Sequence, residues 1–89
     1  MKAIVTVIGP DRVGIIAEVC TLLAGLGVNI LDINQTVMQN FFTMTMLVDT
    51  SLSDRPFDVI ADALSEKGKS MALSIRIQRE DIFSAMHNI

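Results

Sequence analysis

Apolar and polar positions along the chain change their period several times, and each change predicts a new element. Residues 2–8 form a β-branched run with apolar residues on both faces, which is typical of a central strand. From residue 15 the period becomes helical, and the expected helix ends at Gly25 and Gly27 because glycine readily adopts the left-handed C-terminal conformation. The apolar face of this helix is broad and comprises Ile15, Val19, Leu22 and Leu26, flanked by Ile16, Cys20 and Leu23.

The middle of the chain predicts a β-hairpin. Residues 28–38 and 41–48 are expected to be strands, joined by a tight turn at Gln39-Asn40 because asparagine tolerates positive φ. In the first of these strands, one face carries Leu31, Ile33 and Val37, and the other carries Asp32, Asn34 and Thr36. In the second strand, the inward positions are Phe42, Met44, Met46 and Val48.

A second helix and a fourth strand follow. Residues 51–56 break the pattern, and we expect Ser53 or Asp54 to cap a helix whose first turn contains Pro56. The helical spacing of Phe57, Ile60, Ala61 and Leu64 continues to an expected end at Lys67-Gly68. Residues 70–78 alternate as a strand, with Met71, Leu73, Ile75 and Ile77 facing inward.

The predicted order is therefore β-α-β-β-α-β, which indicates an α+β fold of the ferredoxin-like type: a four-stranded antiparallel sheet with two helices on one face. We expect a single domain over residues 1–89, with residues 1–78 forming the βαββαβ core and residues 79–89 a short amphipathic C-terminal helix. Our hypothesis is that this last helix covers part of the other face of the sheet, either in its own chain or in a partner chain. That face is semi-polar and includes Thr6, Thr36, Thr43, Thr45 and Ser74.

The composition of the chain predicts a surface that binds a second copy of the protein. Apolar residues make up 51% of the 89 residues, a high fraction for so small a domain, and a homodimer interface is the simplest explanation. The net charge is −3 and the seven basic residues are scattered, so direct nucleic-acid binding is not expected. No apolar run approaches membrane-spanning length, and a single cysteine excludes an internal disulfide, so we expect a cytoplasmic protein without membrane contact.

The junction between the first strand and the first helix carries the candidate binding chemistry. The residues are Gly9-Pro10-Asp11-Arg12-Val13-Gly14-Ile15, and a helix that starts there leaves backbone N–H groups free to receive a carboxylate or another anion. A phosphate-binding P-loop would need Lys and then Ser or Thr after the second glycine, but Ile15 and Ile16 occupy these positions.

Each polar residue near this junction has a structural and a functional interpretation. Asp11 could be the helix N-cap, bonding the N–H of Val13 or Gly14, or it could contact the ammonium group of a ligand, and Arg12 could be solvated or bind an anion. Gly14 could serve helix–sheet packing or the close approach of a ligand. Asn29 could satisfy its own turn or offer a donor and an acceptor to the charged ends of an amino acid.

Catalysis is not expected. Cys20 lies on the apolar stripe of the first helix, where a small buried hydrophobe is the simplest interpretation. His87 is the only histidine and has no partners at metal-ligand spacing, and no nucleophile, triad or carboxylate pair emerges. We therefore expect no enzyme activity, no metal and no cofactor.

Two junctions together resemble those of the ACT domain family. The predicted element order, the Gly9–Ile15 sequence and Gly27-Val28-Asn29-Ile30 at the next helix–strand junction are similar to the ACT modules of the glycine-cleavage repressor and of formyltetrahydrofolate deformylase. The resemblance covers residues 1–78.

The resemblance implies a regulatory module that binds a small amino acid at a dimer interface and acts allosterically through a partner protein. The implied ligand-binding residues are Gly9, Pro10, Asp11, Arg12, Val13, Gly14, Ile15, Asn29 and Ile30, with Asn29 often coming from the partner subunit. The alternative is a pure interaction module, in which dimerisation is the whole function and no small molecule binds.

Overall fold

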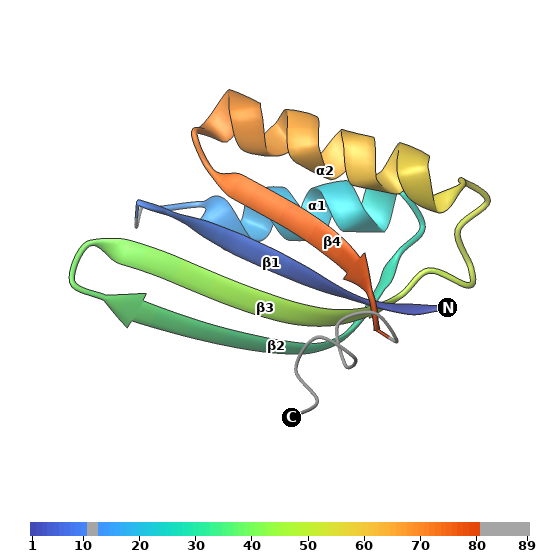
Figure 1. The fold of residues 1–89 in the computed structure, drawn as a ribbon, viewed down its shortest axis with the longest axis horizontal. Helices are drawn as coiled ribbons and strands as arrows, with labels where there is room; N and C mark the ends of the chain where they lie inside the picture. Colours follow the sequence, from blue (N-terminus) through green and yellow to red (C-terminus); the bar gives the residue numbers. More distant parts are fainter. Residues whose placement is uncertain (11–12, 81–89) are drawn as a thin grey trace.

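A computed structural model describes residues 1–10 and 13–80 of the chain. The element order confirms the sequence-based prediction, and Figure 1 shows the arrangement. The elements are β1 (Lys2–Pro10), α1 (Ile15–Gly25), β2 (Asn29–Met38), β3 (Phe41–Asp49), α2 (Phe57–Met71) and β4 (Ser74–Arg79). The expected C-terminal helix over residues 79–89 is wrong at its first residue, because Arg79 belongs to β4; residues 81–89, and with them the hypothetical cover of the sheet, lie outside the described residues.

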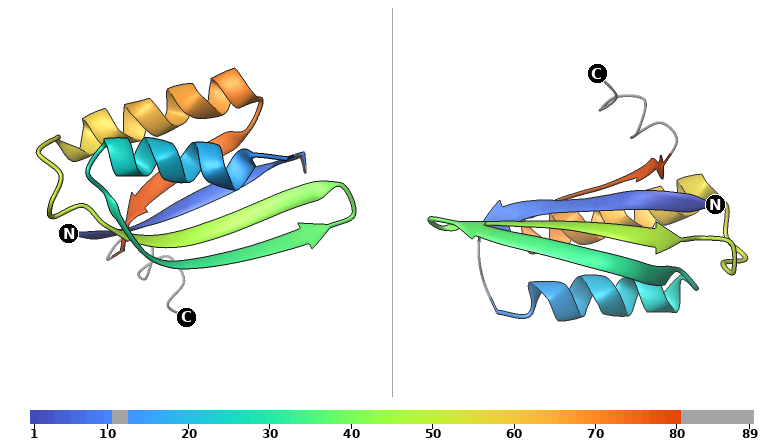
Figure 2. Two further views of the ribbon diagram at one scale, coloured as in Figure 1. Left: turned by 180° about the vertical axis from the view of Figure 1, so that it is seen from behind. Right: turned by 90° about the horizontal axis from the view of Figure 1, so that it is seen from below.

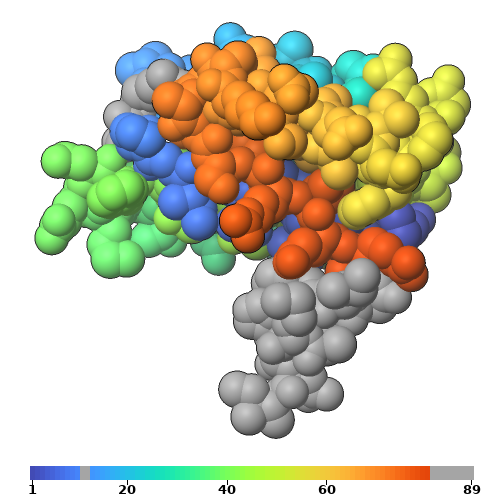
Figure 3. All heavy atoms as spheres, turned by 45° about the horizontal axis from the view of Figure 1, so that its top comes forward, coloured from blue at the N-terminus to red at the C-terminus, as the bar shows by residue number. Residues whose placement is uncertain are grey.

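The four strands form one antiparallel sheet in the order β2-β3-β1-β4. Both helices lie on the same face of this sheet (Figure 2), which is the predicted ferredoxin-like sandwich. In the space-filling view, the surfaces of α2 and β4 adjoin (Figure 3). The two central strands are β1 and β3, and the two edges are β2 and β4.

The core lies between the sheet and the helices. Alternate residues of β1 and β3 face it, as the apolar pattern predicts. The largest fully buried side chains are Ile15, Leu23, Met44, Met46, Ile60 and Leu64 together with Val5, Val7, Val19 and Val48. Cys20 and Leu22 are half-buried and pack against this core, so Cys20 lies on the packing face that its spacing predicts but is less buried than expected.

The turn from α1 into β2 is built on Gly27, whose φ of +75° is accessible to glycine at little cost. The N–H of Val28 donates to the carbonyl of Leu23 over 3.0 Å and closes the helix end. The Ser53 hydroxyl then donates to the carbonyl of Leu26 over 2.6 Å, which ties the β3–α2 loop to this turn. The predicted cap of α2 by Ser53 or Asp54 is wrong, because the N-cap residue is Pro56 and it has no side-chain hydrogen bond.

Helix α2 continues beyond Gly68, where the sequence predicted its end. The left-handed residue at the C-terminus is Ala72, with φ +57°, and the N–H of Leu73 returns to the carbonyl of Gly68 over 2.8 Å. The strand expected over residues 70–78 therefore begins only at Ser74. Gly68 is buried inside the helix because its missing side chain lets the start of β4 approach closely.

The β2–β3 hairpin has the expected two-residue turn, but the positive φ belongs to Gln39 (+55°) and not to Asn40. A bulge between Ile30 and Asp32 makes Leu31 the extra residue of β2. Ile33 and Val37 then share the helix side of the sheet, while Asp32, Asn34 and Thr36 share the outer side with Thr43 and Thr45. Every residue from 31 to 38 is exposed, so β2 is an open edge.

Candidate functional site

The loop between β1 and α1 ends in a glycine whose conformation is special. Gly14 is the N-cap of α1, with φ +91°, and its carbonyl accepts the first intrahelical hydrogen bond from the N–H of Glu18 over 3.0 Å. The interpretation of Asp11 as the N-cap residue is therefore wrong, because Gly14 occupies the N-cap position. Asp11 and Arg12 themselves lie outside the described residues. An ideal Cβ on Gly14 would have no neighbour within 4 Å, so helix–sheet packing does not explain this glycine, but the positive φ does.

Gly9 has a different role in the same loop region. It is buried, and a Cβ added there would collide with the side chain of Leu73 at the start of β4. Close packing between β1 and the α2–β4 connection accounts for Gly9 without any ligand. Pro10 is exposed and ends β1 opposite Phe41.

The first turn of α1 carries backbone N–H groups that have no intrahelical partner. Among the described residues no side chain caps this end, and the N–H groups of Ile15, Ile16 and Ala17 precede the first intrahelical bond. Ile15 is buried and anchors the helix, whereas Val13 is fully exposed at 104%. Three N–H groups and the positive end of the helix dipole therefore lie at this end of α1, an arrangement that favours an anion.

Asn29 and Ile30 lie at the other end of the sheet. Asn29 is exposed and opposite Asp49, which is opposite Lys2, whereas the loop follows Pro10. Eight residues of extended strand separate the two ends, a distance of roughly 26 Å. Ile30 is half-buried and packs against the core. A single chain therefore does not bring Asn29 and the loop together at one ligand.

A groove between the two helices was not anticipated from the sequence. It has a volume of about 380 Å³ and is lined by α1, by Lys67 of α2 and by Arg55 of the preceding loop. The Lys67 ammonium lies 2.7 Å from a carboxylate oxygen of Glu18, and this hydrogen bond and charge lower the pKa of the Glu18 carboxyl. Glu18 and Lys67 are 49 positions apart, and no local pattern in a single sequence indicates that two such distant residues are in contact. Only the packing of the two helices reveals this ion pair.

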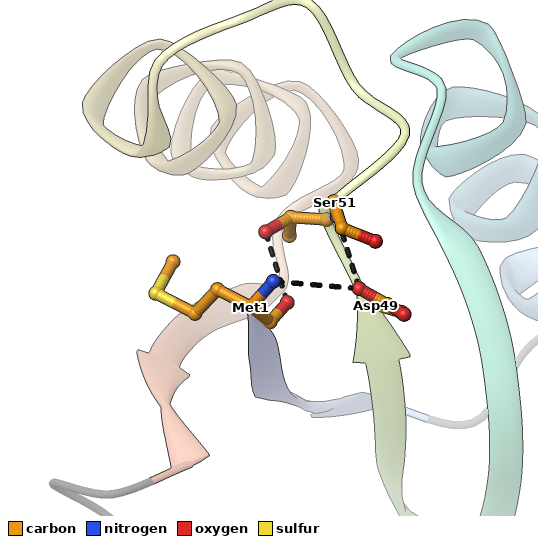
Figure 4. A network of polar contacts seen from close by, with 4 residues as sticks. Met1, Asp49 and Ser51 are labelled. Atoms are coloured by element: carbon orange, nitrogen blue, oxygen red, sulfur yellow. Dashed lines mark hydrogen bonds and ion pairs between the residues drawn. The ribbon is translucent and has the colours of Figure 1, made fainter.

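A second polar network ties the chain start to the end of β3 (Figure 4). An Asp49 carboxylate oxygen accepts a hydrogen bond from the N–H of Ser51 over 2.9 Å and lies 3.5 Å from the Met1 amino group. The Met1 carbonyl accepts bonds from the N–H and the hydroxyl of Thr50 over 2.8 and 3.0 Å. The hydrogen bonds from Ser51, and to a smaller degree the Met1 charge, lower the pKa of the Asp49 carboxyl.

This lowered pKa predicts a pH dependence of stability. A carboxyl whose folded-state pKa lies below its unfolded value of about 3.9 stabilises the fold above that pH, and the contribution is lost as the pH falls through the folded-state value. We expect Asp49→Asn to have a lower Tm than the wild type at pH 7 and the difference to shrink towards pH 3. Thermal unfolding followed by circular dichroism over this pH range measures it.

Asp54→Asn is the matched control, because Asp54 is exposed and its side chain has no hydrogen bond or ion pair within residues 1–10 and 13–80. Its Tm should follow that of the wild type at each pH. An Asp49→Asn variant whose Tm stays parallel to the wild type would contradict the assignment.

No group of three or more His, Cys, Asp or Glu side chains within the described part of the chain is arranged to hold a metal ion. Neither α1 nor α2 has the length and hydropathy needed to cross a membrane.

Comparison with known proteins gives a consistent result. The family model described as the ACT domain matches residues 2–78. A UPF0237 protein of Clostridium acetobutylicum is 55% identical over 89 residues, which is all of both chains. An ACT domain protein from Streptococcus pneumoniae superposes with a TM-score of 0.83 at 40% identity, covering 93% of each chain.

Two further solved structures match this chain over part of their length. A putative glycine cleavage system transcriptional repressor has a TM-score of 0.72 at 28% identity, covering 86% of this chain and 44% of the repressor. A formyltetrahydrofolate deformylase from Pseudomonas syringae has a TM-score of 0.79 at 22% identity, covering 88% of this chain and 27% of the deformylase, and this likeness concerns the fold alone. The two resemblances noted in the sequence are therefore confirmed.

Proposed function

Because this chain belongs to the ACT domain family, whose members are typically regulatory, we propose that it is a regulatory module that binds a small amino acid at the interface of a homodimer. The bound state is then passed on to a partner protein. The observation that carries the proposal is the open N-terminus of α1 next to Gly14.

The start of α1 supplies the ligand's carboxylate with hydrogen-bond donors. The N–H groups of Ile15, Ile16 and Ala17 are available there, and the helix dipole favours a negative charge. The left-handed Gly14 turns the backbone into the helix without a side chain that would block the approach. Charge-assisted hydrogen bonds of this kind contribute roughly 1.5–3 kcal/mol each, and after the cost of immobilising the ligand a micromolar to millimolar affinity results.

Asn29 joins this site from the second subunit. If two β2 edges pair antiparallel about a twofold axis, Asn29 of one chain comes beside Met38 of the other, at the sheet end where β1 enters the loop. The roughly 26 Å that separate Asn29 from the loop within one chain then no longer matter. Two equivalent sites form, each with the helix start of one chain and the asparagine of the other.

The exposure of β2 supports this mode of pairing. An unpaired edge of ten residues presents free backbone donors and acceptors, and such edges readily pair with a second copy. Its helix-side residues Ile33 and Val37 are 40% and 55% exposed although they are apolar. In the register that places Asn29 beside Met38, with Leu31 bulged in both strands, Val37 lies opposite Ile30 of the partner subunit. The two copies of Ile33 lie diagonally across the twofold axis, so pairing through β2 covers both residues.

The same exposed edge favours the alternative function, in which the protein dimerises and binds no small molecule. A thermal-shift measurement with each of the twenty amino acids at about 10 mM separates the two functions. Under the proposal, at least one amino acid raises Tm, since a ligand that binds only the folded state stabilises it by an amount set by the ratio of its concentration to Kd.

Asn29→Ala is expected to abolish that shift while leaving the unliganded Tm within about 2 °C of the wild type, because Asn29 is exposed. Asp62→Ala, at an exposed residue of α2 away from the β2 edge, is the control and should keep the full shift. A flat response of the wild-type protein to all twenty amino acids would favour the pure interaction module. An undiminished response of Asn29→Ala would remove Asn29 from the site.

A further inference from the structure

The outer face of the sheet, opposite the helices, contains a second concave region. It is a groove of about 410 Å³ over β1 and β4, lined by Thr6, Ile8, Ser74, Arg76 and Gln78. This volume lies within the range of sites that hold small organic ligands. None of these five residues belongs to the candidate amino-acid site.

The strand register explains why these side chains converge. Ser74, Arg76 and Gln78 alternate along β4 and so point to the same face. Arg76 lies directly opposite Thr6, and Ser74 lies directly opposite Ile8. Side chains in such cross-strand pairs are neighbours, with Cβ atoms about 4.5–5.5 Å apart.

The groove is lined by hydrogen-bond donors and one positive charge. Thr6, Ser74 and Arg76 can donate hydrogen bonds to a bound group, and none of the five lining residues is acidic. The Arg76 side chain is exposed and makes no ion pair within residues 1–10 and 13–80. A positively charged, donor-rich groove on a chain of net charge −3 selects an anion at this place.

We propose that this groove binds a small organic oxyanion, either a phosphate ester or a carboxylate. The planar guanidinium of Arg76 receives two of the oxygens, and the hydroxyls of Thr6 and Ser74 donate to the same group. Ile8, which is 44% exposed, supports the apolar part of the ligand at the end of the groove.

This second site is independent of the proposed function. The groove lies over β1 and the β4 edge, whereas the proposed dimer uses the β2 edge at the opposite side of the sheet. It also lies on the face away from α1, whose N-terminus is the proposed amino-acid site (Figure 2). Both sites can be occupied in the same dimer, and either can fail without the other.

The test is an NMR titration of the ¹⁵N-labelled full chain with inorganic phosphate and, separately, with acetate, at constant ionic strength made up with chloride. We expect saturable amide shifts centred on residues 6, 8, 74, 76 and 78. A response to phosphate alone identifies a phosphate site, a response to acetate alone a carboxylate site, and a response to both a general oxyanion site. Saturation by neither anion overturns the proposal.

Arg76→Gln should weaken binding about tenfold to a hundredfold, because it removes the charged donor while keeping a side chain of similar reach. Ser74→Ala, a smaller change, should weaken it roughly two- to tenfold. Arg55→Gln, at the groove between the helices, is the matched control and should bind like the wild type. Wild-type affinity in both Arg76→Gln and Ser74→Ala would overturn the assignment. Asn29→Ala should leave anion binding at this groove unchanged.

Discussion

Replacing Ile33 by lysine is expected to convert the proposed dimer into folded monomers. Ile33 lies near the middle of β2, so a twofold axis through this edge makes the two copies of the residue diagonal neighbours. Two lysine ammonium groups this close at the dimer interface lose hydration and repel, which costs several kcal/mol. The dimer Kd should therefore rise at least a hundredfold.

Each chain should tolerate this change. Ile33 is 40% exposed in the single chain, and a lysine there can place its ammonium group in water. Light scattering after size-exclusion chromatography, over a range of protein concentrations, measures the mass, and circular dichroism verifies the fold. The amino-acid response should disappear together with the dimer, because Asn29 and the start of α1 then lie in separate molecules.

Val59→Lys provides the control for this experiment. Val59 is 46% exposed on α2, away from the β2 edge, and is exchanged for the same residue. It should leave the mass of the dimer unchanged. A wild-type protein that is monomeric at all concentrations, or an Ile33→Lys variant that remains dimeric, would rule out pairing through β2.

Gly68→Ala is expected to destabilise the protein, although alanine is the better helix former. An alanine Cβ at this buried position would lie 2.8 Å from the carbonyl oxygen of Leu73 and 3.3 Å from a side-chain carbon of Ile75. Overpacking against backbone costs about 1–3 kcal/mol and exceeds the gain in helix propensity, which is about 1 kcal/mol at most. We expect Tm to fall, by up to about 15 °C for a domain of this size.

Gly25→Ala is the matched exchange in the other helix. An added Cβ at Gly25 has no neighbour within 4 Å, and this residue is the last of α1. Tm should therefore stay the same or rise by a few degrees. Thermal unfolding of both variants and the wild type measures the change in Tm that each substitution causes. A Gly68→Ala variant at least as stable as the wild type would contradict the close approach of β4.

The sequence identified the elements well where a buried face repeats over several turns or alternations. The inward residues Met44 and Met46 of β3, and Ile60 and Leu64 of α2, were all predicted from their spacing and are all buried. The period itself carries the information here, because only one face of each element meets the core. The end of α1 was also predictable, since Gly27 takes the positive φ that its type favours.

Helix ends without such a residue type were not predictable. Ala72, not Gly68, takes the left-handed conformation after α2, and the packing of β4 against the buried Gly68 fixes that boundary. Gln39, not Asn40, carries the positive φ of the hairpin, because a two-residue turn between paired strands takes positive φ at its first position whichever residue stands there. The Ser53 hydroxyl was expected at the start of α2 but instead bonds the carbonyl of Leu26, which is distant in the sequence.

For the candidate site, the sequence determined the residue types at two junctions, Gly9–Ile15 and Gly27–Ile30, and through them the family. Local spacing and glycine positions are enough for that, because a strand–helix junction forms from neighbouring residues. Only the tertiary structure decided that the two junctions lie at opposite ends of the sheet, that Gly9 serves packing against Leu73, and that β2 is the open edge. These facts depend on which strands pair and in which register, and such long-range pairings bring together residues whose relation no local pattern records.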